Sequence, residues 1–398
     1  MLRTLELTNF KCFAGQRVEL AAVTLLAGRN GMGKSTVLQS LLLVRQSDEL
    51  VQHVMGACVA GRSGTAVVPS MGETTQVSLV LNGRYISCGT ARDILHEGAT
   101  EDRIGIRFGW DHEALVDLVF DMSDLSRNHE AHSRDVMRLE KLSLSVSDTR
   151  LIGPPFSGAV PYVAAERIGP RMSHAVSAYH VDDLAEVGHD GAYAVAFLES
   201  HAGQEVIPTL CRSDAPATTL AAQVGAWMAE VSPGIRLHTQ HVPEVNAAAL
   251  HVSFSSGRAT SGRFRPNGVG FGISYALPVV ITLLAAPPGT LVLIENPEAH
   301  LHPRGQMALG ELMARAGAAG VQVIAETHSD HVVNGVRLSV KDRKVPAGQV
   351  KFHYFTRRDE GDRLVHEIES PRIDSDGRLD RWPDGFFDQW DLALERLL

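Results

Sequence analysis

The chain has 398 residues, of which 44% are hydrophobic, so it is long enough for one large or two ordinary domains with a buried core. The formal net charge of −9 argues against a generic polyanion binder and leaves DNA binding possible without implying it. Four widely spaced cysteines, with no CxxC pair, argue against a disulfide framework and a zinc ribbon.

The N-terminal residues alternate between apolar and polar, like a strand, and lack the continuous apolar run of a secretory signal. The best candidate for a membrane span, residues 273–286, is shorter than the roughly 20 apolar residues that cross a bilayer. We therefore expect a cytoplasmic protein with no membrane association.

The first elements read as strands followed by a helix. Residues 2–27 predict two or three strands, the last ending at Gly28, and a helix is expected over residues 34–46. Residues 74–150 alternate like antiparallel strands, with Asn82-Gly83 as a two-residue hairpin signal. The polar stretch at 123–135 predicts an exposed loop.

A second α/β block follows a linker-like segment at residues 211–219. Buried strands are expected at 291–294 and 321–325, separated by a helix with apolar residues on one face: Leu309, Leu312, Met313 and Ala316. Apolar strands separated by helices are typical of a parallel sheet covered on both faces.

The residues GRNGMGKS place Gly28, Gly33, Lys34 and Ser35 in the GxxxxGK[ST] pattern, after an apolar strand and before an amphipathic helix. Glycines let backbone N–H groups point at phosphates, Lys34 bridges the outer phosphates and Ser35 ligates Mg²⁺. A glycine-rich turn with a chance lysine is the alternative, but chance rarely supplies both flanking elements. ATP and Mg²⁺ are the expected cofactors.

Acidic and imidazole groups follow the two later strands. Glu295 comes directly after a buried strand, at the edge where parallel sheets bind ligands, and is the candidate Mg²⁺ acid. His328 follows the next strand and could contact the γ-phosphate or orient water. The alternatives are a surface acid and a structural histidine. A metal site built from His300, His302, His328 and His331 is disfavoured, because these residues have no zinc-ligand spacing.

Five stretches resemble motifs of the ABC-type ATPases of the RecF, SMC and OLD group: LELTNFKCF, GRNGMGKST, IENPEAHLHP, ETHSDH and NGVGFGIS. The nearest likeness is to stand-alone bacterial AAA-family ATPases with a C-terminal domain of unknown function that ends in WPxGFFDQ, here WPDGFFDQ. YVAAERIGPR also has a counterpart in them. The resemblance implies an α/β P-loop NTPase of ABC type: a mixed parallel sheet flanked by helices, an antiparallel β subdomain and a small C-terminal extension.

We accordingly expect an ATP-binding lobe at 1–210, a second part of the ATPase domain at 220–350 and a small C-terminal domain at 351–398. The resemblance adds nucleotide-binding residues to the phosphate loop: Asn30, Gly31 and Thr36, with Lys11 in cis. It also implies a head-to-tail homodimer in which a glycine-rich motif reaches the other subunit's nucleotide, through Asn267, Gly268, Gly270, Gly272 and Ser274. A bare turn before a buried helix, and a solvated lysine, are the alternatives.

One position departs from the group. The residue after the Mg²⁺ acid is usually a glutamate that activates water, but here it is Asn296, which cannot accept a proton. Glu298, assisted by His328, is the substitute base, or else a simple turn carboxylate. Whether the protein hydrolyses ATP, and how fast, is left open.

The leading hypothesis is an ATP-driven dimeric switch acting in antiphage defence or DNA maintenance. The chain shows neither the coiled coil of SMC proteins nor the nuclease domain of OLD proteins, so a separate effector such as a nuclease is expected. A non-hydrolysing sensor or scaffold for a nuclease is the alternative that Asn296 favours, and a transporter ATPase subunit is disfavoured because no LSGGQ sequence is present. The C-terminal aromatic residues predict either a docking surface or a tail folded on its own domain: Trp382, Phe386, Phe387 and Trp390.

Overall fold

The computed structural model describes residues 1–59, 64–66, 77–122, 135–146, 149–361, 363–386 and 394–397. The chain forms two compact units that interleave along the sequence. Unit 1 comprises Met1–Ala21, Arg29–Val160 and Phe355–Glu369, and unit 2 comprises Ala22–Gly28, Pro161–Tyr354 and Ser370–Leu398.

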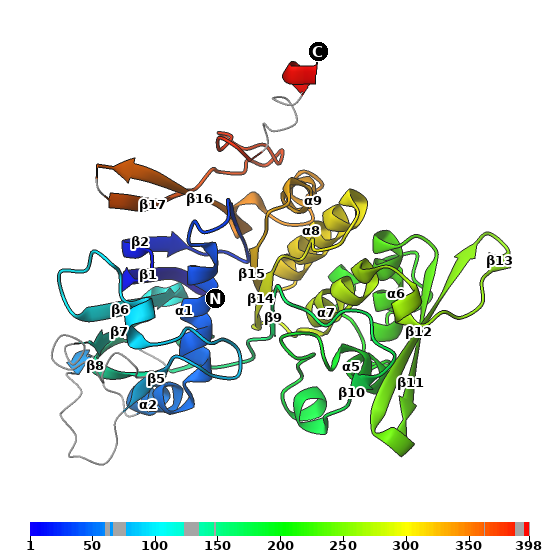
Figure 1. Cartoon of the computed structure of the whole chain (residues 1–398), viewed down its shortest axis with the longest axis horizontal. Coiled ribbons are helices and arrows are strands. Elements are labelled where there is room, and N and C mark those ends of the chain that lie inside the picture. Colours follow the sequence, from blue (N-terminus) through cyan, green and yellow to red (C-terminus); the bar gives the residue numbers. More distant parts are fainter. Residues whose placement is uncertain are drawn as a thin grey trace. The chain divides into compact units, whose positions relative to one another are not determined.

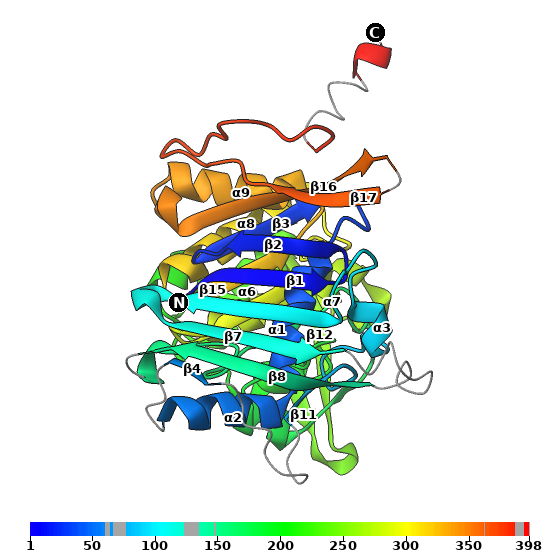
Figure 2. The same ribbon diagram turned by 90° about the vertical axis from the view of Figure 1, so that its left-hand side faces the viewer.

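Unit 1 is built on an antiparallel sheet with the order β2-β1-β6-β7-β8-β4, in which β5 also pairs with β8 (Figure 2). Apolar residues alternate along its strands, so that Ile104, Ile106 and Phe108 of β6 are fully buried. The antiparallel strands expected from this pattern are confirmed. Their bounds are β1 (Leu2–Phe10), β2 (Phe13–Glu19), β4 (Gly64–Ala66), β5 (Ser78–Val80), β6 (Arg103–Trp110), β7 (Leu115–Asp121) and β8 (Val136–Ser145).

Helix α1 (Lys34–Gln46) starts directly after the glycine-rich loop, as expected, and buries Val37, Leu38 and Leu41 completely. The other short elements of unit 1 are α2 (Asp48–Val59), α3 (Ala91–Ile94), η1 (Asp111–Glu113) and η3 (Thr149–Leu151). Of the polar stretch expected as a loop, residues 123–134 lie outside the described residues.

The expected two-residue turn at Asn82-Gly83 is wrong. Asn82 pairs with Ser87 in an isolated bridge, which places the reversal at residues 84–85. The Asn82 side chain is engaged elsewhere, because its Nδ2 donates to the Gly89 carbonyl at 2.8 Å and its Oδ1 accepts from the Gly89 N–H at 3.0 Å. A side-chain bond of this kind competes with the local turn preference of an Asn-Gly pair.

Unit 2 contains a largely parallel sheet in the order β16-β3-β15-β14-β9, and β17 pairs with the part of β16 that continues into unit 1 (Figure 1). Strands β3, β15 and β14 run parallel, as the apolar runs predicted, and the short strand β9, which was not predicted, pairs parallel with β14. The strands are β3 (Val23–Gly28), β9 (Tyr162–Val163), β14 (Leu291–Glu295), β15 (Gln322–Glu326), β16 (Val350–Glu360) and β17 (Arg363–Glu369).

Helices and a smaller sheet complete unit 2. The small sheet has the order β10-β12-β11, with β13 paired to β12. Its strands are β10 (His174–Ala175), β11 (Ile235–Val242), β12 (Ala247–Ser256) and β13 (Ala259–Thr260). The helices and short turns are η4 (Tyr179–Asp183), α5 (Ala194–Ser200), η5 (Pro208–Leu210), α6 (Leu220–Val231), η6 (Pro243–Val245), η7 (Pro266–Gly268), α7 (Phe271–Ala285), α8 (Pro303–Ala318), α9 (Asp330–Lys341) and η8 (Ala347–Gln349). Among the described helices, none combines the length and the apolar run that a bilayer crossing needs.

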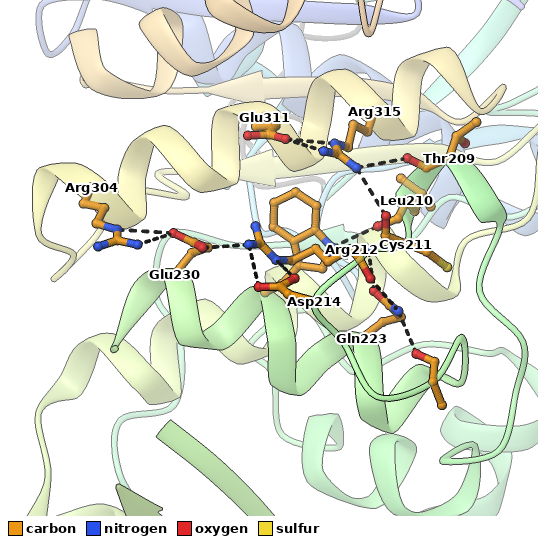
Figure 3. A network of polar contacts seen from close by, with 12 residues as sticks. Thr209, Leu210, Cys211, Arg212, Asp214, Gln223, Glu230, Arg304, Glu311 and Arg315 are labelled. Carbon is orange, nitrogen blue, oxygen red and sulfur yellow. Dashed lines mark hydrogen bonds and ion pairs between the residues drawn. The ribbon is translucent and has the colours of Figure 1, made fainter. Parts of the chain in front are cut away.

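Residues 211–219, which suggested a linker, lie inside unit 2 and are held by a polar network (Figure 3). The buried ring of Trp227 lies between two guanidinium groups, 5.3 Å from Arg212 and 5.4 Å from Arg315. Glu230 accepts from Arg212 at 2.8 Å and from Arg304 at 2.9 Å. This segment is therefore pinned to α6 and α8.

The C-terminal aromatic residues that the structure describes fold back on unit 2. Trp382 is half-exposed and stacks under Arg337, with 4.7 Å between the guanidinium carbon and the ring centre. Phe386 packs against Tyr354 at 5.5 Å between ring centres. Phe387 and Trp390 lie outside the described residues.

Candidate nucleotide site

The phosphate loop leaves strand β3 and turns into helix α1 with three glycines in the left-handed region: Gly28 (φ 137°), Gly31 (φ 74°) and Gly33 (φ 101°). A side chain at Gly33 is also sterically excluded, because its Cβ would lie 2.7 Å from Cys12 Sγ and 2.8 Å from the Phe13 ring. The glycines of this stretch are thus required by the backbone path itself.

Lys34 and Ser35 occupy the first turn of α1, where backbone N–H groups and the helix dipole favour an anion. Lys34 is almost fully buried, and its ammonium group donates to the Arg29 carbonyl at 2.9 Å. Ser35 is half-buried and Asn30 is exposed. The loop residues of the predicted site therefore lie together on one short stretch of chain.

Lys11 and Thr36, which were also predicted to contact the nucleotide, make side-chain contacts inside unit 1. Lys11 donates through Nζ to Gln39 Oε1 at 2.6 Å, on the second turn of α1. The buried Thr36 hydroxyl lies 3.7 Å from Cys12 Sγ. Thr36 thus lies on the first turn of α1, and Lys11 is bound to the second turn.

The parallel register brings the ends of three strands to one edge of the unit 2 sheet. Leu26 of β3 is paired with Glu326 of β15, and Glu326 with Glu295 of β14. Gly28, where the phosphate loop begins, comes two residues after Leu26. The start of the loop, the acid Glu295 and the segment before His328 consequently emerge at the same edge, where ligands of parallel sheets bind.

Glu295 is held at this edge by the loop that follows β9. Its Oε2 accepts from the Ala165 N–H at 3.3 Å and its carboxylate also accepts from the Tyr162 hydroxyl. Burial, reinforced by the Glu295 carboxylate, raises the pKa of Tyr162, so the phenol stays a donor. These two hydrogen bonds orient the half-buried acid at the sheet edge.

Asn296 and Glu298 form a tight turn after β14. Asn296 has a left-handed backbone (φ 45°), and its Oδ1 is buried without a hydrogen-bond partner among the described residues. Glu298 accepts from the Thr327 hydroxyl and from the His328 N–H, each at 2.7 Å. The structure thus joins Glu298 to the residues that follow β15. His328 takes part through its backbone N–H, and its side chain is exposed.

Arg167 is a site residue that motif reasoning missed. Its guanidinium is buried and donates to carbonyl oxygens of three segments: Ala164 after β9, Tyr275 in α7, and Glu295 and Asn296 at the end of β14. Burial lowers the pKa of Arg167 to about 10, and nearby Glu298 opposes that shift, so the side chain remains charged at neutral pH. The charged pair Glu166-Arg167, directly after the apolar residues YVAA, is the signal that could have marked it.

The glycine-rich motif spans η7 and the start of α7, in unit 2. Asn267 and Gly268 are exposed on the turn, and Gly270 is the N-cap residue of α7. A Cβ at Gly268 or Gly270 would meet nothing within 4 Å, whereas at Gly272 it would lie 2.7 Å from the His300 carbonyl. Of these three glycines, packing therefore requires only Gly272.

Ser274 lies on the first turn of α7. Its hydroxyl oxygen is buried without a hydrogen-bond partner among the described residues. A buried hydroxyl normally finds a partner, so an unpaired one at this position is unusual.

Comparisons with known proteins cover nearly the whole chain. A family model described as "AAA domain, putative AbiEii toxin, Type IV TA system" matches residues 23–334, and one described as "Protein of unknown function (DUF3696)" matches residues 345–397. No curated protein matches the chain significantly.

Solved structures of SMC heads align with most of the chain. A SmcHead bound to the C-winged helix domain of ScpA is 14% identical and has a TM-score of 0.50, with 94% of this chain and 98% of that chain covered. An SMC head domain from Thermotoga maritima is 11% identical over 92% of this chain and 98% of its own, with a TM-score of 0.43. A Smc head domain from Pyrococcus furiosus is 11% identical over 100% and 99%, with a TM-score of 0.49.

The first family model spans well over half of the chain, and it includes the end of β3, the phosphate loop, Glu295 and His328. The chain therefore belongs to the AAA-domain family that this model describes, and its fold is similar to that of a solved SMC head.

Proposed function

We propose that the protein binds ATP with Mg²⁺ and acts as a dimeric, nucleotide-driven switch. The observation that carries the proposal is a shared sheet edge. There Gly28 opens the phosphate loop, Glu295 ends β14, and Glu298 is hydrogen-bonded to the residues that follow β15. In this proposal the loop residues from Gly28 to Thr36 hold the phosphates, and Ser35 and Glu295 hold Mg²⁺. Lys11 assists from the same subunit.

A second copy of the chain completes each site in this proposal. The absence of any steric need for glycine at Gly268 and Gly270 supports it, since glycine there leaves the backbone open to close approach by another group. The unpartnered Ser274 hydroxyl, on the first turn of α7, has the chemistry to donate to a phosphate. Nucleotide binding would then close two subunits, and release or hydrolysis would reopen them.

The biological setting of the proposal is cytoplasmic antiphage defence or DNA maintenance, together with a separate effector such as a nuclease. The toxin–antitoxin description of the matching family supports the first setting. The solved SMC head that is bound to the C-winged helix domain of ScpA supports a protein of this fold that works with a separate partner protein.

Removing the loop lysine tests the proposal. Lys34→Ala removes charge-assisted hydrogen bonds to the outer phosphates, so ATP affinity, measured by titration with a fluorescent ATP analogue, should fall at least about 100-fold. Lys341→Ala, which removes an exposed lysine at the end of α9, is the charge-matched control and should bind normally. Equal affinity in both variants and the unmodified protein would remove the basis of the proposal.

A second candidate is a nucleotide sensor or scaffold that binds ATP without hydrolysing it. Asn296 favours it, because an amide in the place of the usual glutamate cannot take a proton from water. In this reading Glu298 is structural, fixing the turn after β14 to the end of β15.

A further inference from the structure

The C-terminal strand β17 touches the tip of the phosphate loop within unit 1. His366 Nδ1 lies 3.1 Å from the Met32 carbonyl oxygen, across 334 positions of sequence. A carbonyl oxygen can only accept, so Nδ1 is the donor, and the neutral ring must carry its hydrogen there.

The same loop tip rests on Phe13, which is 2% exposed. The Phe13 ring lies where a Cβ on Gly33 would be, and it meets the His366 ring edge-on, at 6.3 Å between centres and 84° between planes. Phe355 of β16 packs on Phe13 from 6.4 Å. Met32 and Gly33 are thus held from one side by Phe13 and fixed at the carbonyl by His366.

The orientation of the Met32–Gly33 peptide follows from this contact. In a trans peptide the carbonyl of one residue and the N–H of the next point in opposite directions. When His366 holds the Met32 carbonyl, the Gly33 N–H is directed to the opposite side of the loop. Phosphate loops bind anions through such N–H groups, and their affinity depends on having them oriented before the ligand arrives.

We infer that His366 is a positioning residue that preorganises the phosphate loop for nucleotide. The inference rests on the proposed nucleotide binding, and it gives the C-terminal hairpin β16–β17 a role in that binding. The hairpin belongs to the segment at residues 345–397 that the second family model matches.

Three substitutions separate the hydrogen bond from the bulk of the ring. His366→Asn keeps an N–H donor at the place of Nδ1, His366→Gln moves the donor to the place of Nε2, and His366→Ala removes it. Titration with the fluorescent ATP analogue should show affinity about five- to ten-fold weaker for the Ala and Gln variants, and near normal for Asn. If His366 only filled space, Asn and Gln would not differ in this way. Normal ATP affinity in the Asn variant together with weak affinity in the Gln variant therefore identifies the hydrogen bond as the cause.

Hydrogen exchange in the nucleotide-free protein supplies a readout that does not depend on ATP. Amides of residues 31–35 should exchange faster in the Ala and Gln variants than in the Asn variant and the unmodified protein. Equal affinity and equal exchange in all four proteins overturn the inference alone. If the unmodified protein itself fails to bind ATP, the proposed function falls, and the exchange pattern still decides whether His366 orders the loop.

Discussion

Glu298 is the residue on which the choice between a switch that turns over ATP and a passive sensor depends. Both of its oxygens already accept a hydrogen bond, from the Thr327 hydroxyl and from the His328 N–H. Each carboxylate oxygen has two acceptor sites, so these bonds orient the group and leave it able to accept a proton from water.

The change Glu298→Gln tests this role with little structural disturbance. The amide oxygen can keep the bond from His328, and the amide nitrogen can donate to the Thr327 hydroxyl, which also accepts. If Glu298 is the base, phosphate release should fall about 100-fold or more while ATP affinity stays within a few-fold.

Phosphate release by the unmodified protein is measured in the same assay. No release from either protein would favour the sensor, whereas equal release from both would exclude Glu298 as the base.

At the residue scale, the sequence predicts site residues that belong to one contiguous motif. It misses site residues whose partners are far away in the chain and are brought close only by folding. Lys34 and Ser35 are recognised because their spacing, strand and helix are contiguous in the chain. Arg167 and His366 act through carbonyls more than 100 positions away, and no local pattern marks those partners. Their roles depend on tertiary contacts.

Helices α8 and α9 cross at two glycines. A Cβ on Gly335 would lie 2.2 Å from the Met307 carbonyl, and a Cβ on Gly310 would lie 2.3 Å from the Val332 carbonyl. Backbone atoms cannot move aside as a flexible side-chain end can. The distance between the two helices is therefore set by the absence of side chains at these positions.

We expect Gly335→Ala to destabilise the protein, because a methyl group at 2.2 Å from a carbonyl oxygen forces the helices apart. The loss should be about 1–3 kcal/mol, as in other overpacked interiors. Gly225→Ala in α6 is the matched control: nothing lies within 4 Å of its Cβ, so the higher helix propensity of alanine should stabilise it by about 0.5–1 kcal/mol.

Denaturant unfolding followed by circular dichroism measures both changes. A stability of Gly335→Ala equal to that of Gly225→Ala would contradict the crossing seen here.

At the element scale, long periodic segments were predicted well. The strands β3, β14 and β15 and the helices α1 and α8 follow from apolar runs and helical spacing. The errors fall where a side-chain hydrogen bond to another part of the chain overrides a local preference. Asn82 bonds to Gly89 and displaces the turn, and Gln223 accepts from the Arg212 N–H and donates to the Ala217 carbonyl, each at 2.7 Å, fixing a segment that reads as a linker.

At the scale of the whole molecule, the packing within one chain does not explain why the motif has glycine at positions 268 and 270. Gly268 is exposed and has an ordinary backbone, and nothing lies within 4 Å of the place that a Cβ would take there. A larger side chain at this position should leave the isolated chain intact and obstruct only a second copy that comes close.

We therefore expect Gly268→Gln to leave the melting temperature unchanged and to prevent ATP-dependent dimer formation, measured by light scattering after size exclusion. Gly262→Gln is the control, since Gly262 is also exposed and open. Dimer formation by Gly268→Gln at the level of the control would argue that this motif does not face a partner.

The interleaving of the two units has a consequence for dissecting the protein. Each unit consists of three stretches of chain, and the stretches of the two units alternate along the sequence. No single cut in the chain therefore separates one unit from the other. A truncation before β16 would strip an edge strand from the sheet of unit 2 and remove His366 from the phosphate loop of unit 1 in one step. Fragments made by dividing the gene at one point should accordingly be poor substitutes for the intact chain, and loss of nucleotide binding in them would not locate the binding site.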